Sequence, residues 1–104
     1  MNVHVRDRQG REIYLTDERW QHICEEHSEM QDYKQDVLET VRKGRRFQDS
    51  FRPNVYLYYL AHADLPYDNN TIVVVVHFGF HSDGRENNFV LTSYAIRRQR
   101  NTRQ

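Results

Sequence analysis

The chain alternates short apolar blocks with charged segments from one end to the other. Residues 2–6 (N-V-H-V-R) and 12–15 (E-I-Y-L) each alternate polar and apolar positions around the turn-like segment 7–11. This pattern predicts a β-hairpin with one apolar side. The side chains expected on that side are Val3, Val5, Ile13 and Leu15.

Two segments with helical spacing follow the predicted hairpin. Thr16 is the expected N-cap of the first, and the acidic residues after it suit the positive end of a helix dipole. The apolar stripe of this helix begins at Trp20 and runs to about Met30, which predicts an amphipathic helix of about 13 residues. Asp32 is a possible cap for a second helix, which is expected to end with Gly44 as the C′ glycine.

Beyond Gly44 the pattern changes to short apolar and aromatic runs separated by turn residues, which predicts strands. Strands are expected at residues 47–51, 55–61, 71–80 and 88–96. The order β-β-α-α-β-β-β-β with short connections predicts an antiparallel α+β domain, with an N-terminal hairpin and two helices packed on a sheet of about four strands. We expect one domain over residues 1–98, followed by a basic, flexible tail at 99–104.

Length and composition indicate a single folded domain without a membrane segment or disulfide bonds. A chain of 104 residues has room for one domain, and its 12% aromatic content argues against disorder. We find no apolar run of about 18 residues and no secretion-signal pattern, so the sequence predicts no membrane segment and a cytoplasmic location. The single cysteine, Cys24, excludes an internal disulfide framework and a multi-cysteine zinc site.

The net charge of zero hides two basic segments. Residues 40–63 carry five basic and one acidic side chain, and residues 87–104 carry four arginines and no acid. Arginine binds phosphate through two parallel hydrogen bonds and also stacks on bases, so two such segments on one face would attract a nucleic acid. The alternative is an ordinary solvated surface of mixed charge.

Two histidines of the first predicted helix differ in direction. At 100° per residue, His27 lies within about 20° of Trp20 and is expected to point towards the sheet. His22 lies about 160° away from Trp20, together with Glu26 and Glu29, and is expected to face water. An imidazole between helix and sheet is either a hydrogen-bonded core histidine or a general acid or base at the edge of the core.

The last predicted strand carries a second candidate group. Thr92 and Tyr94 share one face of this strand, whereas Ser93 points to the other. The strand leads into Arg97 and Arg98, so it offers hydroxyl groups beside two phosphate-binding side chains. The alternative is an ordinary strand that ends in a basic segment.

Other chemistry has weaker support in the sequence. Tyr56, Tyr58 and Tyr59 either stack on nucleobases or occupy half-buried strand positions. His77 and His81 lack an evident third metal ligand, and no G-x-G-x-x-G, P-loop or G-x-S-x-G motif is present. We therefore expect neither a metal site nor a cofactor.

Several motifs together resemble one group of nucleases. The run L-T-D-E-R-W-Q-H-I-C-E-E-H-S-E-M at residues 15–30, V-V-V-V at 73–76 and T-S-Y at 92–94 are similar to the phage and mobile-element members of the barnase–EndoU–colicin–RelE superfamily. BrnT-type toxins look like more distant relatives. The resemblance covers about residues 13–98, with Ser28 in place of the usual proline.

The resemblance implies a toxin-like, metal-independent endoribonuclease with this superfamily's fold. In such enzymes the ribose 2′-hydroxyl attacks the adjacent phosphate, which requires a base, an acid and cations around the phosphorus. The implied roles are His27 as base or acid, Arg97 as phosphate clamp, and Tyr94 or Thr92 as proton donor or hydrogen-bond partner. His22 is the reserve histidine if the helix is rotated from its expected position.

The implied partners are RNA and a cognate antitoxin protein. The residues expected to hold the RNA backbone are Arg42, Lys43, Arg45, Arg46 and Arg98. The alternative function is a catalytically inactive module on the same scaffold that binds nucleic acid or protein, because a fold does not fix a function.

Overall fold

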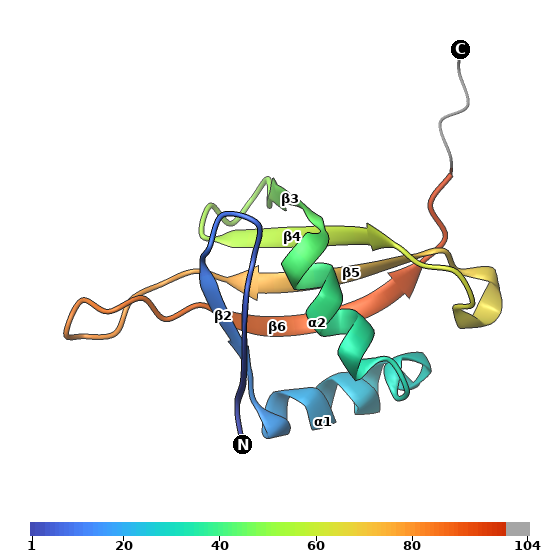
Figure 1. Cartoon of the computed structure of the whole chain (residues 1–104), viewed down its shortest axis with the longest axis horizontal. Helices are drawn as coiled ribbons and strands as arrows, with labels where there is room; N and C mark the ends of the chain where they lie inside the picture. Colours follow the sequence, from blue (N-terminus) through green and yellow to red (C-terminus); the bar gives the residue numbers. More distant parts are fainter. Residues whose placement is uncertain (100–104) are drawn as a thin grey trace, which may run out of the picture.

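Two helices and a six-stranded sheet make up the computed structural model, which describes residues 1–99 (Figure 1). Its elements are β1 (Val3–Arg6), β2 (Glu12–Leu15), α1 (Asp17–Glu26), η1 (Ser28–Met30), α2 (Lys34–Lys43), β3 (Arg45–Gln48), β4 (Val55–Ala61), η2 (Pro66–Asp68), β5 (Thr71–His77) and β6 (Phe89–Ile96). The α+β class and the order of helices and strands are confirmed. Of the predicted tail 99–104, residues 100–104 lie outside the described residues.

The sheet is larger than the predicted one and is mixed rather than antiparallel. Its strand order is β1-β2-β6-β5-β4-β3, because the hairpin joins β6 through a parallel pair between Tyr14 and Phe89. The Tyr14 N–H donates to the Asn88 carbonyl at 3.0 Å, and the Asn88 side-chain amide donates to the Glu12 carbonyl at 3.0 Å. The Tyr14 hydroxyl also donates to Asn87 at 2.6 Å. These bonds extend the sheet by two strands.

The predicted N-terminal hairpin is confirmed in its register. Val3 pairs with Leu15 and Val5 with Ile13, so all four side chains point to one side of the hairpin. Val5, Ile13 and Leu15 are buried in the main core, and Val3 packs against it.

A buried carboxylate closes the hairpin turn and ties it to the centre of the sheet. Asp7 is 6% exposed and accepts hydrogen bonds from the backbone N–H groups of Gln9 and Arg11 and, at 2.7 Å, from the Tyr58 hydroxyl. Burial acts to raise the pKa of Asp7, but the hydrogen bonds from Tyr58, Arg11 and Gln9 outweigh it and hold the pKa below its usual value. The carboxylate is therefore charged and fully engaged at neutral pH.

The two helices begin and end in ways that the pattern predicts only in part. Thr16 is the N-cap of α1, and its hydroxyl accepts from the Arg19 N–H at 3.0 Å, as predicted. The helix ends at Glu26, earlier than expected, and a 3₁₀ turn follows. Asp32 does not cap α2, because the chain at that point is still in a turn closed by the bond from the Tyr33 N–H to the Met30 carbonyl.

Gly44 ends α2 for a reason other than the predicted left-handed glycine cap. Its backbone is extended (φ −71°), so any residue could adopt this conformation. A Cβ at this position, however, would lie 2.4 Å from the Thr40 carbonyl oxygen and 2.8 Å from the Tyr59 carbonyl oxygen. The chain therefore passes from α2 directly into β3 at Arg45, two residues before the predicted start of that strand.

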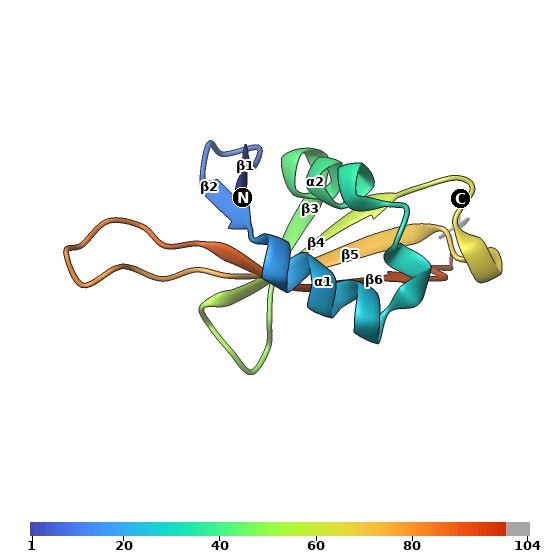
Figure 2. The same ribbon diagram turned by 90° about the horizontal axis from the view of Figure 1, so that it is seen from below.

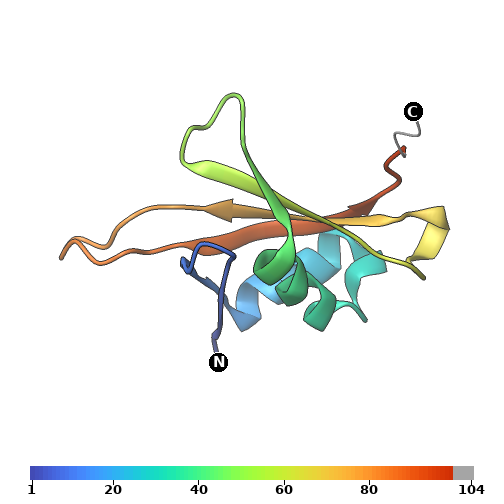
Figure 3. The ribbon, with the colours of Figure 1, turned by 45° about the horizontal axis from the view of Figure 1, so that its top comes forward.

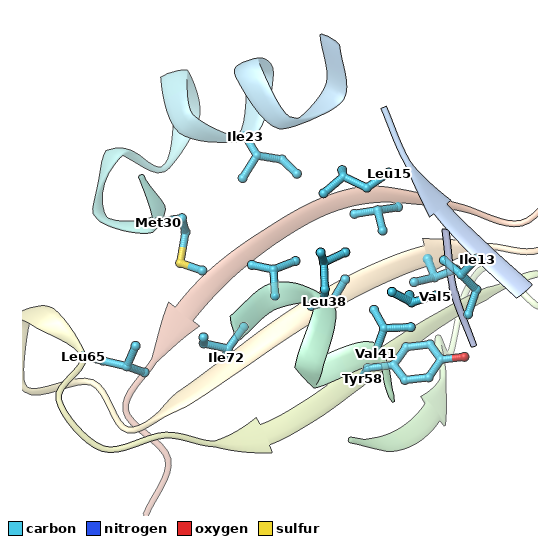
Figure 4. Close-up of a cluster of buried hydrophobic side chains, with 14 residues drawn as sticks. Val5, Ile13, Leu15, Ile23, Met30, Leu38, Val41, Tyr58, Leu65 and Ile72 are labelled. Carbon is cyan, nitrogen blue, oxygen red and sulfur yellow. The ribbon is translucent and has the colours of Figure 1, made fainter. Parts of the chain in front are cut away.

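The helices and the hairpin lie against one face of the sheet and enclose the main core (Figure 2). Alternate residues of the central strands point into it, as Ile72, Val74 and Val76 of β5 do. Leu38 and Val41 of α2 and Ile23 of α1 meet them from the other side (Figure 4). At about 25 cal/mol per Å² of apolar surface removed from water, these side chains dominate the stability of the fold.

The opposite face of the sheet has no helix over it in the described part of the chain (Figure 3). We call this surface the open face. It is formed by the buried Val55, Val73 and Val75 and the half-buried Leu57, Tyr59, Leu91, Tyr94 and Ile96. The loop between β3 and β4 projects on this side, whereas the helices lie on the other, so the open face has a raised border at that end (Figure 3).

A β-bulge in β6 decides which residues reach the open face. Val90 pairs with Val76 and Thr92 pairs with Val75, which leaves Leu91 as an extra residue. In a regular strand Val90, Thr92 and Tyr94 would all point to the same face. Because of the bulge, Val90 faces the main core, whereas Thr92 and Tyr94 face away from it.

The helices of residues 1–99 do not reach the length and hydropathy that a membrane-spanning helix needs. The connection between β5 and β6, residues 78–88, extends well beyond the rest of the molecule (Figure 1). It carries the exposed Phe80.

Candidate active site

The site is built around a contact between His27 and Tyr94. Their ring centroids lie 5.7 Å apart with the ring planes inclined at 40°. Beyond Phe89, β6 has β5 on one side, and α1 and η1 pack along the other. His27 is the residue that caps the C-terminus of α1, so its ring lies at the outer edge of β6, beside a residue of the open face.

His27 lies at the border of the protein and not within the core. Its side chain is 33% exposed, and its Nδ1 is 3.8 Å from a carboxylate oxygen of Glu29. That distance is too long for a hydrogen bond but short enough for an ion pair when the imidazole is protonated. With Nδ1 beside this carboxylate, Nε2 is the ring nitrogen left for a ligand.

Glu29 is a site residue that the sequence analysis misses. The helical wheel places Glu29 with Glu26 on the face towards water. The 3₁₀ turn at Ser28–Met30 changes the direction of the chain, and the Glu29 side chain is only 20% exposed. The apolar spacing gives no signal of this change, because Met30 stays buried as the helical pattern requires.

Tyr94 supplies a hydroxyl group that keeps its proton. Burial raises the pKa of Tyr94, and the neighbouring Tyr59 raises it further. Both tyrosines flank Val73 on the open face, because Val73 pairs with Tyr59 on one side and with Tyr94 on the other. At neutral pH the Tyr94 phenol is therefore a hydrogen-bond donor and not a base.

One row of paired residues crosses the open face towards the other edge of the sheet. From His27 and Tyr94 it passes Val73 and Tyr59 and ends at Arg45 on β3, which pairs with Tyr59. With about 4.8 Å between neighbouring strands, β6 and β3 are about 14 Å apart. The row therefore joins an imidazole and a phenol at one edge to a guanidinium at the other.

Arg98 adds a second positive charge to this face. Its guanidinium carbon lies 4.7 Å from the centroid of the Tyr59 ring, a cation–π geometry. Arg98, Arg45 and Lys43 line a hollow of about 710 Å³ that also includes Tyr59 and Thr71 of the open face. The predicted RNA-binding residues Lys43, Arg45 and Arg98 thus come together.

Thr92 lies in the neighbouring row of the open face, opposite Val75. Its hydroxyl oxygen is buried and has no hydrogen-bond partner among the described residues. Ser93 points the other way, as predicted, and donates to the Val73 carbonyl at 2.8 Å.

Other predicted site residues lie elsewhere. Arg97 donates to Asp68 of η2 at 2.5 Å. Arg42 pairs with Glu39 at 3.2 Å on α2. His22 lies on the exposed face of α1 as predicted, with Nδ1 3.6 Å from Glu25.

The remaining tyrosines are divided between the two faces of β4. Tyr58 is buried in the main core, and Tyr56 lies under the Arg46 guanidinium, whose carbon is 3.8 Å from the ring centroid. Tyr59 alone of these three lies on the open face. Arg46 is therefore on the helix side of the sheet, away from the hollow that contains Arg45 and Arg98.

Residues 1–99 contain no group of three or more His, Cys, Asp or Glu side chains placed to hold a metal ion. The His77 ring makes a 2.9 Å hydrogen bond with the Asn54 side chain and stacks on Phe89 with a centroid distance of 5.0 Å. His77 is thus engaged in packing the strand end.

No family model, curated protein or solved structure matches this chain.

Proposed function

We propose that the protein is a metal-independent endoribonuclease that cleaves single-stranded RNA. The observation that carries this proposal is the contact between His27 and Tyr94 at the edge of an aromatic and basic sheet face. An imidazole stands there beside a phenol that keeps its proton. General acid–base cleavage of a phosphodiester needs both kinds of group.

In this proposal His27 is the base. Nε2 takes the proton of the ribose 2′-hydroxyl, the 2′-oxygen bonds to phosphorus, and the bond from phosphorus to the 5′-oxygen breaks. The Glu29 carboxylate beside Nδ1 stabilises the imidazolium that forms. The products are a 2′,3′-cyclic phosphate and a free 5′-hydroxyl.

Tyr94 supplies the proton for the leaving oxygen. Its raised pKa keeps it protonated until a strongly basic alkoxide develops beside it. Since its ring contacts His27, the imidazolium can then return a proton to the phenolate, which restores both groups for another turnover. Thr92 takes no part in this step, because its hydroxyl oxygen is buried.

The open face holds the RNA strand. Arg98 and Arg45 bind phosphates, and the exposed surface of Tyr59 accepts a stacked base, an interaction that every base can make. Arg98 takes the phosphate role that the sequence assigns to Arg97, because Arg97 is paired with Asp68. The resemblance in sequence further suggests a toxin of a phage or mobile element that acts in the cytoplasm and is held inactive by an antitoxin protein.

The product ends of a labelled oligonucleotide test this proposal. The wild-type protein is incubated with a single-stranded RNA and with the same sequence carrying 2′-deoxyribose throughout. We expect cleavage of the RNA only, products with 2′,3′-cyclic phosphate, and no effect of EDTA. Binding of the RNA without cleavage under any condition would favour an inactive nucleic-acid-binding module.

A further inference from the structure

A second basic hollow lies outside the open face, between the β1–β2 turn and the start of β3. Its volume is about 370 Å³. Four arginines line it together with Gln9, Gly44 and Phe47, namely Arg8, Arg11, Arg45 and Arg46. Arg8 and Arg11 come from the hairpin turn, so the hollow exists only because the turn is docked on the sheet.

Two of these arginines are held in place by neighbouring groups. Arg11 donates to the Asp7 carboxylate at 3.2 Å and to the Gln9 side-chain oxygen at 3.1 Å. Arg46 stacks on the Tyr56 ring, with its guanidinium carbon 3.8 Å from the ring centroid. Burial and Asp7 raise the pKa of Tyr58, and the positive charges of Arg46 and Arg11 oppose this rise. Both guanidinium groups are therefore near the Tyr58 hydroxyl.

The Asp7 carboxylate beside this hollow does not balance the positive charge of the four lining arginines. Asp7 is the one carboxylate in hydrogen-bond contact with a lining arginine among the described residues, and it already accepts from Tyr58 and from two backbone N–H groups. Four arginines therefore line the hollow beside one carboxylate that is engaged elsewhere. An anion with several oxygen atoms would satisfy their free N–H groups and remove their mutual repulsion.

We propose that this hollow is a phosphate-binding site. Guanidinium groups from the turn and from β3 approach it from two sides, an arrangement that suits the tetrahedral oxygens of a phosphate group. Arg45 lines both this hollow and the larger one on the open face, so the two are continuous around the β3 edge. A strand of RNA that leaves the open face across β3 would place a backbone phosphate here, an assignment that rests on the proposed function.

The first experiment uses inorganic phosphate and needs no cleavage. Thermal melting of the full chain is followed as phosphate replaces chloride at constant ionic strength. The variant Arg8→Gln/Arg45→Gln removes two lining charges, and Arg19→Gln/Arg85→Gln removes two exposed charges elsewhere. We expect Tm to rise by about 5 °C in the wild type and in the control pair at roughly tenfold excess over Kd, and by less than half of that in the hollow variant.

An equal rise in all three proteins, or none in any, would overturn the site. Arg8→Gln alone guards against a variant that is damaged for other reasons, because Arg8 is exposed and its loss should still weaken the phosphate effect.

The second experiment identifies the source of the phosphate. Binding of a single-stranded RNA to the His27→Ala protein, which should not cleave, is measured against salt concentration with and without Arg8→Gln, because Arg45 also lines the hollow of the open face. Loss of one phosphate contact should make the slope of log K against log salt less steep by about 0.7. An unchanged slope, in a protein whose phosphate effect on Tm is weakened by Arg8→Gln, would assign the hollow to a free phosphate and overturn its role for RNA.

The two experiments separate this inference from the proposed function. A protein that shows the phosphate effect on Tm but cleaves no RNA contradicts the endoribonuclease and leaves the phosphate site standing. A protein that cleaves RNA without the phosphate effect contradicts the site alone.

Discussion

The His27 ring packs against the Tyr94 ring at the edge of β6, so the end of the first helix and the last strand meet at one point. Neither residue is in the main core, and each belongs to an element that the core holds firmly: Ile23 anchors α1, and Ser93 is bonded to Val73 within the sheet. The pair is therefore fixed in place by a scaffold that does not depend on its own side chains. Substitutions in the pair should thus separate chemistry from folding.

Replacing His27 by alanine should abolish most of the cleavage and leave the fold intact. Removal of a proton-transfer group lowers the rate by about 10²–10⁴, whereas RNA affinity stays close to that of the wild type because the phosphate contacts remain. The measurement is cleavage of a labelled RNA beside a binding titration and a thermal melt. His22→Ala, on the exposed face of the same helix, is the matched control and should keep full activity. Full activity of His27→Ala, or a collapse of Tm, would remove its catalytic role.

Tyr94→Phe should reduce cleavage with little change in stability. The ring that packs against His27 is kept, and the hydroxyl makes no hydrogen bond to the described residues that would be lost. We expect a decrease in kcat of about 10–10² and a change in unfolding free energy within about 0.5 kcal/mol. Tyr59→Phe removes a phenol from the same face and should affect kcat less. A Tyr94→Phe enzyme with unchanged kcat would show that this hydroxyl donates no proton.

Arg98→Gln should weaken RNA binding in a salt-dependent way. With about four phosphate contacts, the wild-type slope of log K against log salt should lie near −3, and loss of one contact should change it by about 0.7. Fluorescence anisotropy with a single-stranded RNA at several salt concentrations measures both quantities. Arg97→Gln is the control, because Arg97 is paired with Asp68, and its slope should match the wild type. The reverse result would restore the role that the sequence assigns to Arg97.

Asp7→Asn should destabilise the protein most at neutral pH. The carboxylate accepts bonds from Tyr58, Arg11 and Gln9, and its loss should cost about 3 kcal/mol. Because the folded-state pKa lies below the ordinary value, this contribution is present above about pH 4 and is lost as the pH falls through the folded pKa. Urea unfolding from pH 7 to pH 2.5 should therefore show the difference between wild type and variant shrinking at the acidic end. A difference independent of pH would contradict the charged carboxylate.

The periodicity predicts the local structure well because the residues that decide it are close in sequence. Thr16 caps its helix through a bond to a residue three positions away, and the apolar and aromatic run at residues 55–61 gives β4 its observed bounds. The same reasoning places His27 on the sheet side of the helix and Tyr94 opposite Ser93. Their contact does not follow from these two directions, because Tyr94 lies on the face away from the helices and meets His27 only at the edge of β6.

The features that the sequence does not predict depend on contacts between distant segments. The parallel pair of β2 with β6 rests on the side chains of Asn87 and Asn88, which read as ordinary turn residues. The pairing of Arg97 with Asp68 depends on where the η2 loop lies, which the pattern of the last strand does not show. The phosphate hollow escapes the analysis for the same reason, since its arginines belong to two segments that meet only in the folded sheet.

Because of the bulge at Leu91, β6 can lose one residue at that point without a change in its pairing with β5. Val90 and Thr92 already pair with the adjacent residues Val76 and Val75, so a chain that lacks Leu91 would keep both halves of the ladder in their present pairing. Loss of a second residue between Val90 and Tyr94 would instead shift Tyr94 by one place and turn its ring from the open face to the helix side. Natural length variation in this strand should therefore be limited to one residue at the bulge, and any variant shortened further would bring a different face of the strand to His27.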